Sequence, residues 1–213
     1  MSSCCEDKSC AIDALRERQR GTLTAVLGIN AVMFVVVMAG GLIAGSTALL
    51  SDSLDNLGDA LTYALSIYAV SRSPRTKGKV ALFKGFLILG AGLFVAAQVV
   101  YKLLHPQLPL FDTMGIIGVL NLLANLGCLA LLWKHRSEDV NMSSVWECSR
   151  NDIVSNLSVL AAAAGVWLTA SPWPDLVIGS LLAALFLRSA WRVLGDARKS
   201  MRNAPGESAP QGV

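Results

Sequence analysis

The chain has 213 residues, of which 54% are hydrophobic and only 15% carry a charge. A soluble domain carries about 25% charged residues, so this deficit, together with long apolar runs, excludes an ordinary soluble protein and indicates a polytopic membrane protein. The formal net charge of +3 says little alone. The basic residues are spread between the apolar runs and not gathered in one patch, which argues against nucleic-acid binding.

Six stretches are long and apolar enough to cross a bilayer as helices. They cover residues 22–44, 47–70, 80–103, 113–133, 142–170 and 175–194. The predicted fold class is therefore an all-α membrane protein with six transmembrane helices in one domain, residues 22–194. Residues 1–21 form a polar segment before it, and residues 195–213 form a short tail that we expect to be disordered.

The connections between the spans alternate in charge, which predicts the orientation. Lys and Arg occur in the segment before the first span, in the second and fourth connections and in the tail, whereas residues 45–46 and 171–174 have none. The positive-inside rule then places both termini in the cytoplasm. Residues 1–20 lack the apolar core of a cleavable signal peptide, so we expect none.

Three cysteines, Cys4, Cys5 and Cys10, lie in the predicted cytoplasmic segment, where thiols stay reduced. A Cys-Cys-x4-Cys cluster among polar residues could capture soft metal ions. The spacing matches no standard zinc motif, so incidental or lipidated thiols on a frayed end are the alternative interpretation.

The second span is densely polar for a membrane helix. Asp55 and Asp59 are four residues apart, which brings their carboxylates to one helix face and makes a two-ligand claw. Asp52 shares that face and is a candidate for an indirect role beside the metal or for a proton path, with a solvated or capping carboxylate as the alternative. Each ionised Asp at mid-bilayer costs on the order of 2.5–3.5 kcal/mol, which favours a bound cation that compensates the cost.

The fifth span carries a second claw, in which Cys148 and Asp152 are also four residues apart. With Asp55 and Asp59 on a facing helix, the two claws would offer four ligands of mixed sulfur and oxygen character, a set that suits tetrahedral Zn²⁺ or Cd²⁺. The alternative is that Cys148 packs while Asp152 pairs with an Arg. Cys128, in the apolar fourth span, is expected to be a small packing residue.

The predicted depths of the two claws differ. At 1.5 Å per residue, Asp55 lies roughly 12 Å from Thr47, whereas Asp152 lies roughly 27 Å from Ala170. Both of those ends should face outward. The claws therefore meet only if the fifth helix projects further outside than the second, or if the predicted boundaries are wrong.

These motifs resemble those of the cation diffusion facilitator family of divalent-metal/proton antiporters. The stretch 45–59 resembles the family's second-helix signature, 148–155 its fifth-helix signature, 121–132 its Asn-bearing fourth helix and 174–194 its sixth helix. The resemblance covers roughly residues 12–200. It implies that Asp55, Asp59, Cys148 and Asp152 are the metal ligands, that protons are the exchanged ions, and that a bacterial inner (plasma) membrane is the location.

Three departures from the family pattern bear on function. Cys148 stands where the family usually has His, which favours softer ions. The basic loop 77–84 lacks the usual Gly-Tyr-x-Arg-x-Glu, and the sequence stops where most members begin a cytoplasmic metal-binding domain that helps them dimerise. We still expect a homodimer, but neither dimerisation nor regulation by that domain carries over.

The resulting hypothesis is export of a divalent transition metal, Zn²⁺ or Cd²⁺ first, with no resident cofactor. Co²⁺, Ni²⁺, Fe²⁺ and Hg²⁺ remain open, and a thiolate ligand disfavours Mn²⁺. A membrane metal sensor or non-transporting subunit is the main alternative. An intramembrane enzyme is disfavoured, because the only histidines, His105 and His135, fall in predicted loops away from the claws.

Overall fold

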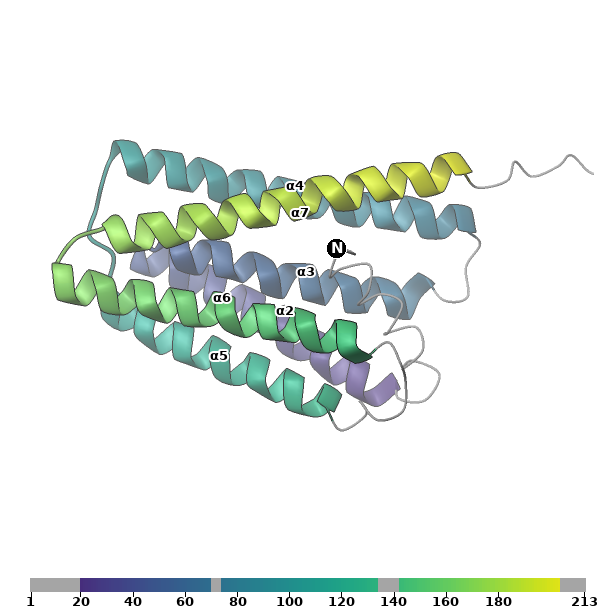
Figure 1. The fold of residues 1–213 in the computed structure, drawn as a ribbon, viewed down its shortest axis with the longest axis horizontal. Coiled ribbons are helices and arrows are strands. Elements are labelled where there is room, and N and C mark those ends of the chain that lie inside the picture. Colours follow the sequence, from purple (N-terminus) through teal and green to yellow (C-terminus); the bar gives the residue numbers. More distant parts are fainter. Residues whose placement is uncertain (1–19, 70–73, 134–141, 204–213) are drawn as a thin grey trace, which may run out of the picture.

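The computed structural model describes residues 20–69, 74–133 and 142–203, and these fold into a bundle of long helices (Figure 1). The helices are α2 (Arg20–Ala44), α3 (Thr47–Ala69), α4 (Pro74–Leu104), α5 (Phe111–Trp133), α6 (Met142–Thr169) and α7 (Trp173–Asn203). They correspond in order to the six predicted spans, so the predicted all-α membrane fold is confirmed. α7 continues to Asn203, beyond the predicted end of the sixth span at residue 194.

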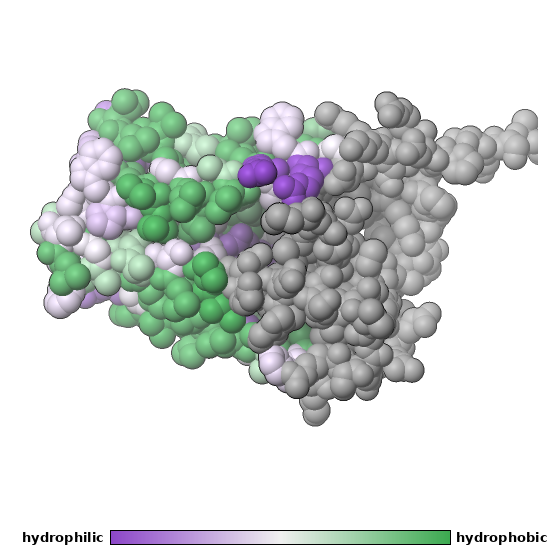
Figure 2. Space-filling model, in the orientation of Figure 1, coloured by the Kyte–Doolittle hydropathy of each residue, from purple (hydrophilic) through white to green (hydrophobic). Residues whose placement is uncertain are grey.

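Five of these helices, all except α3, contain stretches long and apolar enough to cross a membrane. α3 is 23 residues long, but it carries three aspartates, more charge than an ordinary membrane span holds. Because α3 lies among the other five helices, it is the polar member of a membrane bundle and not a separate soluble element (Figure 1). Large apolar side chains such as Ile43, Ile116 and Leu168 face outward, as lipid-facing residues do. The face seen in Figure 2 is mainly hydrophobic over the described residues.

α3 lies at the centre of the bundle and packs on both sides. One apolar cluster joins it to α2, α5 and α6, with Leu49 and Met114 fully buried. A second cluster joins it to α4 and α7 through Leu50, Leu54 and Val95. The central position buries the polar side chains of α3 inside the protein, away from lipid, where other helices can supply their hydrogen-bond partners.

The turn from α2 into α3 is built from two adjacent caps. Gly45 has a φ of 62°, the left-handed conformation that favours glycine, and the Ser46 N–H donates to the Gly41 carbonyl at 2.9 Å, which ends α2 in a Schellman motif. The Ser46 hydroxyl then accepts a hydrogen bond from the Leu49 N–H at 3.1 Å and caps α3. Lys102 on α4 donates to the Gly45 carbonyl and ties α4 to the same turn.

Candidate functional site

The aspartates singled out from the sequence lie on α3 and α6. Asp52 on α3 is buried, with 1% of its surface exposed, whereas Asp55 and Asp59 on the same helix and Asp152 on α6 are partly buried. Asp55, Asp59 and Asp152 each interact with other groups of the protein. α3 and α6 are in contact, and Asp152 is close enough to Asp52 to act on it electrostatically.

Asn121 on α5 joins α3 to α6 at this level. Its Nδ2 donates to Asp52 Oδ2 and to Asn156 Oδ1, each at 2.7 Å, and its Oδ1 accepts from Asn56 Nδ2 at 3.1 Å. Asn156 Nδ2 in turn donates to the Asp152 carbonyl at 2.8 Å. All three asparagines are buried, with 2% or less of their surface exposed. We name Asp52, Asn56, Asn121 and Asn156 the asparagine junction; it fixes the register of three helices beside the predicted ligands.

The asparagine junction shows how α3 and α6 are offset along the membrane, which decides whether the two claws can lie at the same depth. Asp52 is in the second turn of α3, yet it is level with Asn156, which lies about 20 Å before the end of α6 at 1.5 Å per residue. α6 therefore extends further than α3 at the end where it joins α7, as Figure 1 shows. This is the projection of the fifth span that the two claws require.

The four-ligand metal site remains a prediction. Among the described residues, no group of three or more His, Cys, Asp or Glu side chains is placed to hold a metal ion. Cys148 belongs to α6, but its side chain lies outside the described residues, as do Cys4, Cys5, Cys10 and His135. Of the four predicted metal ligands, the structure therefore describes the side chains of Asp55, Asp59 and Asp152 only.

Two of the minor predictions are confirmed. Cys128 is buried at 7% exposure and packs within the bundle, where the Asn30 amide lies 3.7 Å from its sulfur. His105 is exposed just after α4, where its ring stacks on Tyr101 with 4.8 Å between the centroids. Neither residue is part of the asparagine junction.

Sequence reasoning missed the role of Asn156 and of Asp175. An asparagine within an apolar span is costly unless it is paired, so Asn56, Asn121 and Asn156, one on each of three spans, were a usable signal. Asp175 sits in the first turn of α7 and is 1% exposed. Its carboxylate accepts hydrogen bonds from the start of α3, including the Ser46 hydroxyl at 2.6 Å. No spacing rule relates residues this far apart in the chain.

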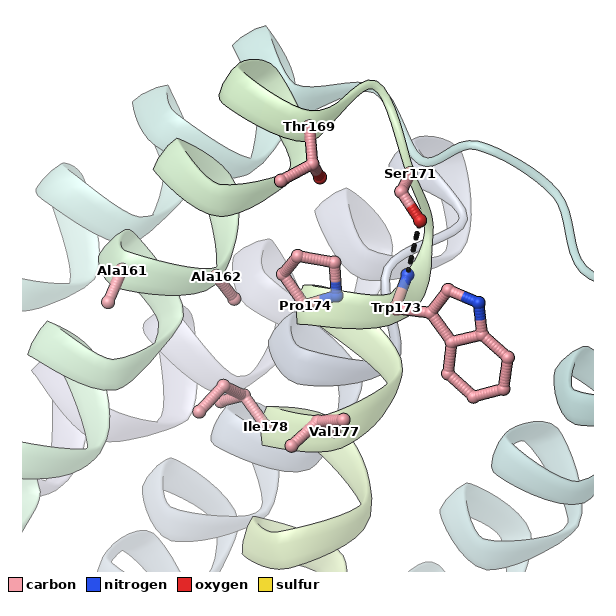
Figure 3. Close-up of a pocket in the computed structure, with 8 residues that line it drawn as sticks. All are labelled: Ala161, Ala162, Thr169, Ser171, Trp173, Pro174, Val177 and Ile178. Carbon is pink, nitrogen blue, oxygen red and sulfur yellow. Dashed lines mark hydrogen bonds between the residues drawn. The ribbon is translucent and has the colours of Figure 1, made fainter.

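A separate pocket of about 470 Å³ lies where α6 turns into α7 (Figure 3). Its lining is Ala161, Ala162, Thr169, Ser171, Trp173, Pro174, Val177 and Ile178. None of these eight carries a carboxylate, imidazole or thiol, so the pocket offers no side-chain ligand of the usual kind for a transition metal.

The chain matches known proteins over most of its length. The family model described as the cation efflux transmembrane domain matches residues 23–201. The chain belongs to the cation diffusion facilitator family. The metal cation efflux system protein CzcD of Cupriavidus metallidurans is 25% identical over 204 residues, which cover 90% of this chain and 63% of that protein.

Two zinc transporters named ZitB are similar as well. The protein of Yersinia pestis is 28% identical over 199 residues, which cover 87% of this chain and 64% of its own length. The protein of Escherichia coli K12 is 28% identical over 190 residues, which cover 82% and 60%. This chain thus spans a little under two thirds of the length of these relatives. Its apolar helices and bacterial relatives make it an integral multi-pass protein of the bacterial plasma membrane.

Proposed function

We propose that this cation diffusion facilitator exports divalent transition-metal cations from the cytoplasm, Zn²⁺ or Cd²⁺ first, in exchange for protons. The observation that carries the proposal is the set of carboxylates inside a membrane bundle: Asp52, Asp55 and Asp59 on α3 with Asp152 on the contacting α6. Ionised carboxylates are costly in a membrane, and a bound cation offsets part of that cost. The names of the relatives, a metal cation efflux protein and zinc transporters, support the same cargo.

The ligands and the coupling follow from the chemistry of the site. Asp55, Asp59, Cys148 and Asp152 are the proposed ligands, and metal binding requires them deprotonated, so protons and metal compete for one site. Protons can therefore take the place of the metal on these ligands once it has left. Exporting a divalent ion against about 100 mV, inside negative, costs roughly 4.6 kcal/mol, which inward proton movement can offset. Rocking of the helices around the site would expose it to each side in turn.

The test is metal flux into proteoliposomes under an imposed pH gradient, with Zn²⁺, Cd²⁺ and Mn²⁺ compared. Zn²⁺ or Cd²⁺ movement that depends on the pH gradient and disappears in Asp152→Ala supports the antiporter. Asp112→Ala is the matched control, because Asp112 is an exposed carboxylate in the first turn of α5. Flux that survives in a well-folded Asp152→Ala protein rejects the site. Metal binding without flux in the wild-type protein favours a sensor or subunit instead.

A homodimer is part of this proposal. A small helical bundle can associate in the membrane through close packing of helix surfaces, since apolar side chains alone do not favour protein over lipid. Chemical crosslinking in native membranes at low protein abundance, compared with a monomeric membrane protein of similar size, tests it. A crosslinked species of twice the chain mass is expected, and monomer alone would reject the dimer.

A further inference from the structure

Three buried polar atoms on α3 and α6 have no hydrogen-bond partner among the described residues: Asp52 Oδ1, Asn56 Oδ1 and Ser155 Oγ. Their residues are 1%, 1% and 7% exposed. A buried polar atom without a partner costs about 1–3 kcal/mol, so folded proteins nearly always fill such positions with a partner, a water or an ion. Three of them in one region therefore point to a ligand.

The asparagine junction gathers these atoms. Asn121 Nδ2 donates to the other carboxylate oxygen of Asp52, and Asn121 Oδ1 accepts from the amide nitrogen of Asn56. Asp52 and Asn56 are one turn apart on one face of α3. Each uses one side-chain atom to bond Asn121, and the remaining oxygen of each has no partner among the described residues. Ser155 on α6 is near enough to the Asp52 carboxylate to interact with it, although no hydrogen bond of ordinary geometry joins the two side chains. One carboxylate, one amide and one hydroxyl thus each contribute an oxygen from two contacting helices.

On each of the two helices, one of these residues lies three positions outward of a proposed metal ligand. With the predicted orientation, α3 runs from outside to inside and Asp52 precedes Asp55 by three residues. α6 runs from inside to outside and Ser155 follows Asp152 by three residues. Each step is about 4.5 Å along a helix, so the Asp52 and Ser155 oxygens lie about one turn outward of Asp55 and Asp152, on the side where exported metal leaves, whereas Asn56 directly follows Asp55 and lies close to its level.

We propose that Asp52, Asn56 and Ser155 form a second, all-oxygen cation subsite, which receives the divalent metal on its way out. Asn121 is the positioning residue that holds Asp52 and Asn56 in place. Oxygen donors bind hard divalent cations and hold soft ones weakly, in contrast to a site that contains a thiolate. A weak outer subsite helps release, because conduction requires binding that is weak enough, or spread over enough sites, to let the ion leave.

The place of the subsite on the exit path rests on the proposed transport function, but its existence does not. The direct test uses Mn²⁺, which prefers oxygen ligands and is detected by electron paramagnetic resonance. The purified double variant Asp59→Asn/Asp152→Asn, which lacks two proposed main-site ligands, is titrated with Mn²⁺. One bound Mn²⁺ per chain is expected, and adding Asp52→Asn or Ser155→Ala should weaken the binding about tenfold or more, because affinity follows ligand charge and number.

Matched controls are available on the same elements. Ser158→Ala removes an exposed hydroxyl of α6 that bonds the Val154 carbonyl at 2.8 Å, and Asp112→Asn removes an exposed carboxylate of α5. Neither should change Mn²⁺ binding. If the double variant does not fold, the wild-type protein is titrated with its main site filled by Cd²⁺, and a remaining Mn²⁺ site should disappear in Asp52→Asn.

Two outcomes overturn the subsite. Either no Mn²⁺ binds, or binding is the same with and without Asp52→Asn; the three oxygens then hold only water. In flux assays, Asp52→Asn should lower the maximal rate more than it changes the KM for metal, since loading from the cytoplasm uses the main site. A failure of the transport proposal is recognised separately, because wild-type protein would then show no flux while the Asp52-dependent Mn²⁺ signal persists.

Discussion

The Asp175 carboxylate at the start of α7 caps the start of α3 through Thr47, accepting hydrogen bonds from its backbone N–H and from its hydroxyl, each at 2.8 Å. The Ala48 N–H adds a third at 3.0 Å. These amides are among those that a helix leaves without intrahelical partners, and a negative charge at that end also interacts favourably with the helix dipole. The polar helix α3 is therefore fixed to α7 at the end where α3 begins.

Asp175→Ala is expected to destabilise the protein by about 2–4 kcal/mol, because it leaves several buried donors of α3 without an acceptor. The measurement is the midpoint of thermal unfolding in detergent, followed by tryptophan fluorescence. Asp112→Ala, at the exposed start of α5, is the control and should shift the midpoint little. An Asp175→Ala protein as stable as the control would show that the cap contributes nothing.

Gly179→Ala is expected to cost about 1–3 kcal/mol by overpacking. A Cβ at this position would lie 2.6 Å from the carbonyl carbon of Thr47 and 2.8 Å from the Ala48 nitrogen, and backbone atoms cannot move aside cheaply. Gly90→Ala on α4 is the control, because a Cβ there meets nothing within 4 Å. The same unfolding assay should show a lower midpoint for Gly179→Ala only.

The helices were predictable because they depend on local pattern. The length of each apolar run gives a span, and a spacing of four residues puts Asp55 and Asp59 on one face. Cys128 in an apolar run was correctly predicted to pack. These inferences need only the geometry of a single helix.

The contacts between helices were not predictable in this way. Asn121 meets Asp52 and Asn156 only because of the relative register of three helices, which depends on how their apolar faces pack. The cap at Asp175 depends likewise on the crossing of α3 and α7, at a separation of 128 residues from Thr47. The single sequence shows that these groups are polar and in apolar surroundings, but not which of them are partners.

Asn121→Leu keeps the side-chain size but removes the amide that bonds the other three residues of the asparagine junction. Asp52 Oδ2, Asn56 Nδ2 and Asn156 Oδ1 would all lose the partner shown here, and each loss costs about 1–3 kcal/mol when no water replaces it. Lower thermal stability and lower metal flux are expected together. Asn30→Leu is the matched control: it removes another buried asparagine amide, which bonds the Val26 carbonyl of its own helix at 3.0 Å. Flux should fall in Asn121→Leu and persist in Asn30→Leu.

Replacing Cys4, Cys5 and Cys10 with Ser tests the proposed capture of metal before transport. The KM for Zn²⁺ or Cd²⁺ should rise about two- to fivefold with an unchanged maximal rate, because soft thiol ligands are lost while the membrane site is intact. Initial rates in proteoliposomes oriented with the cytoplasmic side exposed give both constants. An unchanged KM would return these thiols to incidental residues.

Cys148→His should move the selectivity of transport from Cd²⁺ toward Zn²⁺. Imidazole is a harder ligand than thiolate, so replacing sulfur with nitrogen weakens Cd²⁺ binding relative to Zn²⁺, while both ligands suit tetrahedral Zn²⁺. The quantity to measure is the ratio of kcat/KM for Cd²⁺ to that for Zn²⁺, which we expect to fall about tenfold, or roughly 1.4 kcal/mol in relative transition-state stabilisation.

The matched control for this change is Cys128→Ala. Cys128 is a buried thiol on α5 whose neighbour is Asn30, so its loss should leave the Cd²⁺ to Zn²⁺ ratio unchanged. Because the comparison uses a ratio from one protein preparation, a change in the amount of folded protein cancels. A ratio that stays the same in Cys148→His would show that Cys148 does not set selectivity, and would leave the three aspartates, Asp55, Asp59 and Asp152, as the ligands that determine which metal is carried.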